Sequence, residues 1–146
     1  EGGEQGGRQG STADWRVCKS IFVAEGDATA RRYAGDRDGA YGFYYWNLLT
    51  KRRTRGQADI YKHDLAMSDA AVTVEYLLDR LVLCGSVNRV VEQILAFRDT
   101  IGDFGTLLYA GHDWADARLA RRSMELMAEK VMPAVNAAIA KQFRAA

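Results

Sequence analysis

The sequence has few of the residues that bind metals or form disulfide bonds. Its 146 residues include two cysteines, two histidines and one proline. The cysteines and histidines show no close ligand spacing, so we expect no metal site. Cys18 and Cys84 both lie in apolar, strand-like runs, which predicts buried free thiols and a cytoplasmic setting.

An excess of one charge and long hydrophobic runs are also missing. The formal net charge is +1, which argues against nucleic acid or an anionic membrane as the main partner. One local exception is the basic run 51–55. No apolar stretch reaches the roughly 20 residues that span a bilayer, and no secretory signal pattern opens the chain.

The composition that remains is that of one globular unit, with 48% hydrophobic and 27% charged residues. Residues 1–14 are the exception, because they are rich in glycine and lack an apolar period. The chain begins with Glu rather than Met. The glycine-rich stretch is therefore interpreted as a linker, a processed end or the interior of a longer protein.

Three short apolar runs, at 17–23, 81–86 and 104–111, predict β-strands. Helical patterns separate them, and each strand is apolar on both faces. This is typical of an α/β fold with a parallel sheet covered by helices. No Gly-x-Gly-x-x-Gly motif follows any strand, so a dinucleotide-binding fold has no positive signal.

The helical segments carry apolar stripes and capping residues. The apolar positions between 41 and 49 fall on one helical face, and 69–80 and 87–101 also have helical patterns. Asp27, Ser86 and Asp116 are the expected N-caps of three helices. Pro133 is expected to break or kink the last helix.

The last third of the chain resembles a known family. The stretch LVLCGSVNRVVEQILAFRDTIGDFGTLLYAGHDW, followed by LARRSMELMAEKVMPAVN, resembles the C-terminal part of luciferase-like, flavin-dependent monooxygenases. The shared features are a Gly-Ser turn that opens a helix, in Val-Leu-Cys-Gly-Ser at 82–86, and a closing helix with Met132-Pro133. SIFVAEGDATARRYA is similar to an earlier strand and helix of that family. The resemblance covers 15–138.

The resemblance implies that residues 15–146 are the last three βα units of a (β/α)8 TIM barrel, an incomplete barrel without its first five units. Residues 1–14 would then be the end of the preceding helix and a connecting loop, and 50–71 a lid-like insertion before the second strand. The implied activity belongs to the full-length parent. It would use reduced FMN, supplied by a reductase, to insert one oxygen atom from O2 into an organic substrate.

Two other interpretations stay open at this point. The same barrel superfamily includes oxidoreductases that use the deazaflavin F420, and this segment would serve them equally well. Alternatively, the chain is a non-catalytic α/β fragment that completes its fold with an N-terminal barrel half or with a second copy of itself.

The barrel rule places candidate site residues at the carboxyl ends of the strands. There His112 would act as an acid or base toward the flavin or substrate, and Gly111 and Trp114 would line the flavin pocket. Gly85 and Ser86 would offer backbone N–H groups to an anion. The alternatives are a solvated strand end at 111–114 and an ordinary capped helix start at Ser86.

Further candidates lie in the lid-like insertion and in the first strand. In the lid-like insertion, basic residues that include Arg53, Lys62 and His63 would attract a flavin phosphate or an anionic substrate. The alternative is a solvated basic helix end. Of the two polar residues in the first strand, we expect Ser20 to face the barrel interior and Lys19 to extend its ammonium to solvent.

Overall fold

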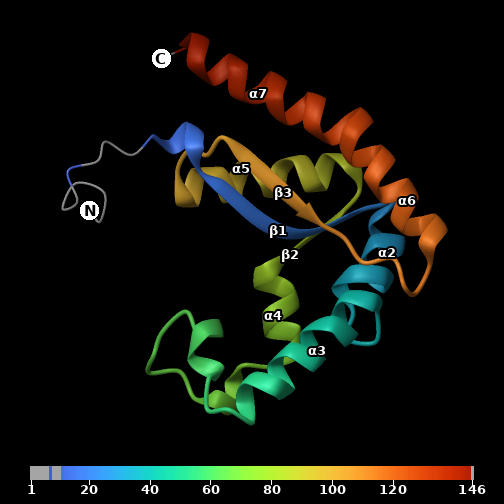
Figure 1. Ribbon diagram of the computed structural model, residues 1–146. Helices are drawn as coiled ribbons and strands as arrows, with labels where there is room; N and C mark the ends of the chain where they lie inside the picture. Colours follow the sequence, from blue (N-terminus) through green and yellow to red (C-terminus); the bar gives the residue numbers. More distant parts are fainter. Residues whose placement is uncertain (1–6, 8–10, 146) are drawn as a thin grey trace.

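The computed structural model describes residue 7 and residues 11–145 (Figure 1). The predicted connecting segment 1–14 therefore lies mostly outside the described residues. Its last part forms a 3-10 turn, Thr12–Asp14, in which the Ser11 hydroxyl accepts a hydrogen bond from the Ala13 N–H. No helix within the described range is long and apolar enough to cross a membrane.

Three parallel strands form the sheet: β1 (Arg16–Val23), β2 (Val82–Gly85) and β3 (Thr106–Ala110). They lie in the order β2-β1-β3, so β1 pairs with both of the others. Ser20 is opposite Val82 on one side and Ala110 on the other. The three predicted strands and their parallel arrangement are confirmed.

Helices connect and cover the strands. They are α2 (Asp27–Ala30), which continues as a π-helical turn (Arg31–Gly35), α3 (Ala40–Arg53), α4 (Val74–Leu81), α5 (Val87–Ile101), α6 (Ala117–Leu126), a second π-helical turn (Met127–Val131) and α7 (Met132–Ala145). Segment 54–73 contains two 3-10 turns, Ala58–Tyr61 and Asp69–Ala71.

The helices lie on both faces of the sheet (Figure 1). Phe22 and Val82 pack against α3 and α4 on one face. Ile21 and Val23 pack against α5, α6 and α7 on the other. The chain moves from β1 to β2 in one direction and from β2 to β3 in the reverse direction. If both connections have the same handedness, their helices must then lie on opposite faces of the sheet, as α3 and α4 on one face and α5 on the other do here.

This arrangement differs from three consecutive units of a barrel. In a barrel, successive strands are neighbours and all helices lie outside, so β2 would lie between β1 and β3. Instead β1 is central, and α3 and α4 cover the face opposite to α5. The mixed α/β class is confirmed, whereas the predicted order of three successive units is not.

Several local predictions need correction. Cys18 is exposed rather than buried, because the buried part of β1 begins only at Ser20. Gly26, not Asp27, is the N-cap of α2, and Ser86 caps α5 without a side-chain hydrogen bond. The cap at Asp116 is confirmed, since its carboxylate accepts the N–H groups of Arg118 and Leu119.

Pro133 does not break the last helix. It lies at the second position of α7, directly after the π-helical turn Met127–Val131. Proline has no N–H to donate to the preceding turn, and a wider turn accommodates that loss without ending the helix.

Candidate functional site at the carboxyl edge of the sheet

β1 and β3 separate at their carboxyl ends. Their pairing stops at Ser20 and Ala110. Beyond that point, side chains form hydrogen bonds with the backbone of β1. The Tyr41 hydroxyl donates to the Ile21 carbonyl over 2.6 Å, and the Ser123 hydroxyl accepts from the Val23 N–H over 2.7 Å. In open parallel sheets, a gap at this edge is the usual ligand site. Here it is filled by protein hydroxyls, so a ligand must bind above it.

The loop above this gap carries His112 in an aromatic surround. The His112 ring lies 4.4 Å from the centres of the Tyr41 and Tyr44 rings and 4.5 Å from that of Trp114. The Tyr33 hydroxyl donates to the His112 carbonyl over 2.9 Å. The loop is therefore held from below by the π-helical turn and from one side by α3.

One ring nitrogen of His112 has no partner. Its Nε2 atom is buried and makes no hydrogen bond to any described residue. Burial lowers the pKa of His112 below 6.5, and the nearby Asp113 carboxylate opposes this only in part. The ring is therefore neutral at neutral pH. Its unpartnered nitrogen can donate or accept a hydrogen bond, depending on the tautomer.

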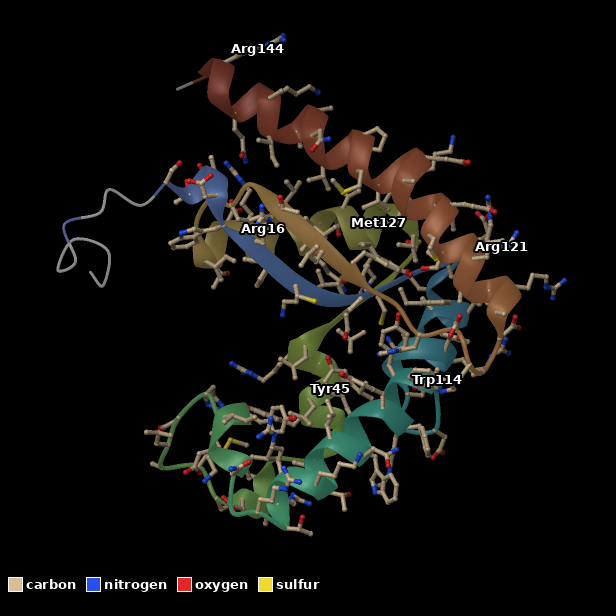
Figure 2. All side chains as sticks on the ribbon, in the orientation of Figure 1. Arg16, Tyr45, Trp114, Arg121, Met127 and Arg144 are labelled. Atoms are coloured by element: carbon tan, nitrogen blue, oxygen red, sulfur yellow. The ribbon has the colours of Figure 1, made fainter. Side chains whose placement is uncertain are left out.

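A small apolar hollow lies next to this histidine. It has a volume of about 170 Å³ and is lined by Phe43, Tyr44, Asn47 and Trp114. Trp114, which is labelled in Figure 2, is 54% exposed. Binding pockets for drug-sized molecules typically measure about 300–1,000 Å³. The hollow is therefore too small to enclose such a molecule by itself.

Gly111 is required by close packing at this edge. A Cβ atom there would lie 2.7 Å from the Tyr109 ring. Tyr109 in turn makes a 2.9 Å hydrogen bond with the buried Ser123. A larger residue at position 111 would push Tyr109 away from the bond that organises the end of β1.

Gly85 and Ser86 lie at the end of β2, beside a second and more polar hollow. The Ser86 N–H donates to the Asp27 carboxylate over 2.6 Å, which is the first cause of the lowered pKa of Asp27. Gly85 has a φ of +156°, a conformation that favours glycine. The backbone N–H of Ser86, predicted to serve an anion, is thus already occupied by a carboxylate.

The predicted cations Arg53 and Lys62 bind residues of their own segment or directly next to it. Arg53 donates to the carbonyls of Asp69 and Val72. Lys62 contacts the carboxylates of Asp59 and Asp69 at 2.6 Å each, which raises its pKa. None of the contacts recorded for them among the described residues joins these cations to His112.

His63 and Ser20 also have local partners. The His63 Nδ1 lies 2.9 Å from the hydroxyl of Tyr76 in α4. Ser20 faces α3, and its hydroxyl lies 2.9 Å from that of Tyr45. Lys19 is half-buried. Its ammonium donates to the Arg80 carbonyl over 3.1 Å and lies 4.6 Å from the centre of the Phe97 ring. Within residues 7 and 11–145, no group of three or more His, Cys, Asp or Glu side chains could hold a metal ion.

Sequence reasoning missed the tyrosines that surround His112. The aromatic cluster 41–46 is interpreted as core packing, because its helical spacing predicts a buried face and nothing more, and Tyr33 is not singled out. The available signal was the density of hydroxyl-bearing rings on a buried face, since a buried hydroxyl needs a partner.

The chain is similar to part of several known monooxygenases. The chain is 31% identical over 134 residues to a 4-hydroxyprotoasukamycin monooxygenase from Streptomyces nodosus subsp. asukaensis, an alignment that covers 91% of the chain and 33% of the relative. It is 30% identical over 120 residues to a 3,6-diketocamphane 1,6-monooxygenase from Pseudomonas putida, covering 82% and 32%. No protein-family model matches the chain.

A solved structure agrees in fold as well as in sequence. It is the oxygenating constituent of 3,6-diketocamphane monooxygenase from Pseudomonas putida, a type II Baeyer-Villiger monooxygenase in complex with FMN. It matches 90% of the chain and 36% of its own length, with a TM-score of 0.73 and 28% identity. The chain matches the C-terminal part of a luciferase-like, flavin-dependent monooxygenase. It spans about a third of the length of these relatives.

Proposed function

We propose that the chain is the C-terminal part of a reduced-FMN-dependent monooxygenase that inserts one oxygen atom from O2 into an organic substrate. The likeness to a solved monooxygenase with bound FMN supports this proposal most directly. It favours FMN over the alternative cofactor F420. A cytoplasmic protein served by a separate flavin reductase is part of the same proposal.

The residues present fit one side of a flavin site. The buried Nε2 of His112 lacks a partner, and the exposed indole of Trp114 stands beside it. An aromatic wall with one unpaired polar atom suits a planar, largely apolar ring with a few hydrogen-bonding groups. The opposite wall and most phosphate contacts must come from elsewhere.

Each residue of this wall has a distinct role. Reduced FMN, when bound, supplies the electrons that activate O2. Trp114 and Tyr44 exclude water from one side of the site. His112 accepts a proton from the ligand at Nε2, because its neutral form at neutral pH is a base, and as imidazolium it can return that proton. Tyr33 positions the loop through the His112 carbonyl.

The strand order suggests how the chain fits into a (β/α)8 barrel. β1 and β3 are neighbours, and the helices that follow them in barrel order, α5 and then α6–α7, share one face. These are the features of two successive barrel units. The short β2 and residues 24–86 are then an excursion from the carboxyl end of β1. The lid-like segment 50–71 belongs to that excursion, at the end of the barrel where active sites lie.

A disulfide trap tests the strand order. Cys18 is opposite Leu108 in the register of β1 and β3. Neighbouring strands lie about 4.8 Å apart, within reach of a disulfide, whereas an intervening β2 would roughly double that distance. In a Cys84→Ser background, Leu108→Cys should crosslink to Cys18 under mild oxidation, as seen by mass spectrometry. Leu107→Cys is the matched control, because its side chain points to the other face.

A chimera tests the function. The matched part of the 3,6-diketocamphane monooxygenase would be replaced by this chain, and FMN retention and incorporation of isotope-labelled oxygen would be measured. We expect both to survive, and His112→Asn to lower oxygen incorporation about 10²-fold or more. His63→Asn is the control. A folded chimera that holds no FMN would refute the proposal.

The alternative of a non-catalytic fragment that needs a partner rests on one further observation. The first half of β1 and β3 is uncovered on the α3 side, where Cys18 is exposed and Leu108 is 48% exposed. We propose that the remainder of the monooxygenase, whether in the same chain or in a second chain, covers this face. A stable dimer of the chain alone, in which Leu108 is protected, would favour self-association instead.

A further inference from the structure

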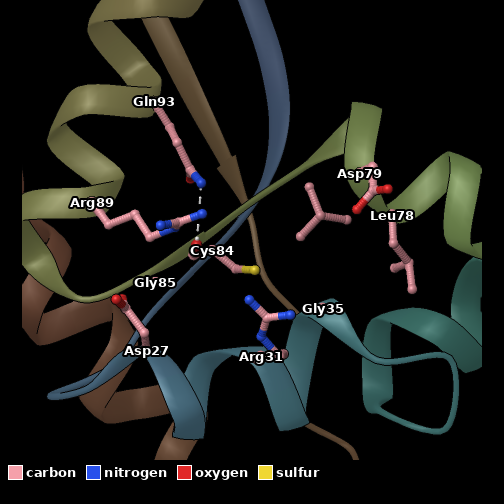
Figure 3. Close-up of a pocket in the computed structure, with 10 residues that line it drawn as sticks. Asp27, Arg31, Gly35, Leu78, Asp79, Cys84, Gly85, Arg89 and Gln93 are labelled. Atoms are coloured by element: carbon pink, nitrogen blue, oxygen red, sulfur yellow. Dashed lines mark hydrogen bonds between the residues drawn. The ribbon is translucent and has the colours of Figure 1, made fainter.

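A second hollow, separate from the His112 surround, lies between α2, α4, β2 and α5 (Figure 3). Its volume is about 210 Å³. Arg31, from the π-helical turn, and Arg89, from α5, approach it from opposite sides, with Cys84 of β2 between them. Both guanidinium groups are close enough to Cys84 to influence the pKa of its thiol, which burial raises.

The two arginines are available to a ligand. Within the described part of the chain, neither Arg31 nor Arg89 makes a recorded hydrogen bond or ion pair. Gly85 keeps Arg89 in place, because a Cβ at position 85 would lie 2.7 Å from its side chain. Two guanidinium groups that converge on one small cavity favour an oxyanion, since each can donate two parallel hydrogen bonds.

One acceptor in the same hollow lacks a donor. The amide of Gln93 donates from Nε2 to the Cys84 carbonyl over 3.3 Å, whereas its buried Oε1 has no partner among the described residues. A buried acceptor without a donor is unfavourable. The hollow therefore suits an oxyanion that also carries an O–H group.

Two carboxylates limit the choice of ligand. Asp27 and Asp79 also line the hollow, so its formal charge is balanced. Asp27 is already bonded to the Ser86 N–H. Asp79 makes no recorded ion pair within the described range, so it adds a second acceptor. A fully deprotonated anion would be repelled by these groups, whereas one with its own donors can satisfy them.

We propose that this hollow binds the phosphate group of a small phosphorylated molecule, with the phosphate oxygens on Arg31 and Arg89 and a ligand hydroxyl on Gln93. Phosphate binding at this site can be tested separately from the proposed flavin activity. Inorganic hydrogen phosphate shares the chemistry, because it has both an anionic oxygen and an O–H group.

Calorimetric titration of the 146-residue chain tests this site. Hydrogen phosphate should bind, and sulfate, which has no O–H donor at neutral pH, should bind more weakly. Chloride at matched ionic strength should give no saturable heat. Absence of saturable phosphate binding, or equal affinity for sulfate, would overturn the proposal. Amide shifts at Gly85 and Arg89 on phosphate addition should locate the ligand.

Variants separate the site from general charge attraction. Arg31→Gln and Arg89→Gln should each raise the phosphate dissociation constant about tenfold or more. Arg32→Gln removes the same charge from the neighbouring position and should change it little. Equal losses for Arg31→Gln and Arg32→Gln would show diffuse attraction and overturn the site. Because both arginines are exposed, the variants are expected to fold, which circular dichroism checks.

Competition distinguishes the source of the phosphate. If the phosphate belongs to FMN, inorganic phosphate will displace FMN, and riboflavin will neither bind nor compete. If it belongs to another metabolite, ribose 5-phosphate will displace phosphate while FMN does not. Either result supports the site. Loss of FMN binding with phosphate binding retained would count against the proposed function and leave the phosphate site standing.

Discussion

The two faces of the sheet are built from different kinds of side chain. The face under α5, α6 and α7 is mainly aliphatic, with Ile94, Val131 and Val135 packed on Ile21 and Val23. The face under α3 and α4 is rich in tyrosine. There Tyr33 stacks on Phe22 at 4.3 Å, and Tyr41 is fully buried.

This difference separates stability from organisation of the site. Aliphatic burial is strong but has no direction, so it holds α5 and α7 against the sheet without fixing any polar atom. Tyrosine adds a hydroxyl that must find a partner when buried. The hydroxyls of Tyr33 and Tyr41 bond to backbone at the carboxyl edge and thereby place the His112 loop.

The largest expected effect comes from the aliphatic face. Ile94 is 2% exposed, and Ile94→Ala should lower the free energy of unfolding by about 2–5 kcal/mol, through lost burial and a cavity. Denaturant unfolding measures this. The NMR signals of His112 should stay in place below the transition. A large shift of those signals would show that the two faces are coupled.

Removing one hydroxyl should have a smaller but more local effect. Tyr41→Phe leaves the Ile21 carbonyl without its donor and should lower the free energy of unfolding by about 1–3 kcal/mol. It should also move the His112 signals, since the two rings are 4.4 Å apart. Tyr44→Phe is the control, because its hydroxyl makes no recorded bond among the described residues. Similar losses for both variants would contradict the assigned role.

The tyrosine-rich face, unlike the aliphatic one, should also give a pH-dependent contribution to stability, through His112. Its folded-state pKa lies below 6.5, so the unfolded chain takes up a proton first as the pH falls. The stability that the neutral ring contributes is complete above the ordinary pKa of 6.5. It is lost as the pH falls from there through the lower folded-state pKa. In His63→Asn protein, an NMR titration should give a midpoint below 6.5 for the single remaining histidine. Trp114→Ala should move it upward by exposing the ring.

The smallest effect is expected at the surface. Arg122 on α6 contacts the Glu25 carboxylate, at the end of β1, at 2.7 and 2.9 Å, but it is solvent-exposed. Arg122→Gln should change the melting temperature little, and less still at high salt. A large loss that persists in salt would indicate that this pair, rather than the tyrosines, holds the carboxyl edge together.

Local patterns explain what the sequence could predict. Strand and helix positions follow from apolar periodicity, and the cap at Asp116 depends only on the next three residues. His112 could be placed because loops after parallel strands share one edge. The order β2-β1-β3 depends on the path of crossovers between distant segments, which periodicity does not contain.

The same limit explains the errors at single residues. Asp27 accepts from the N–H of Ser86, a residue on a distant segment, so the local expectation of an N-cap was wrong. Cys18 lies on a strand whose burial changes halfway along its length. That Arg53 and Lys62 take part in ligand binding stays a prediction. Both contact residues in segment 59–72, and the sequence alone did not indicate these local partners.

The central position of β1 has a consequence for the order of folding. Ser20 must pair with Val82 and with Ala110, both of which follow it by many residues. During synthesis the first strand is therefore made long before either neighbour exists, and the sheet cannot close until β3 has left the ribosome. Pairings of such long sequence separation slow folding. Among the three described strands, β1 with its apolar stretch 21–23 is thus the one that waits longest for its partners, exposed to aggregation or to chaperones.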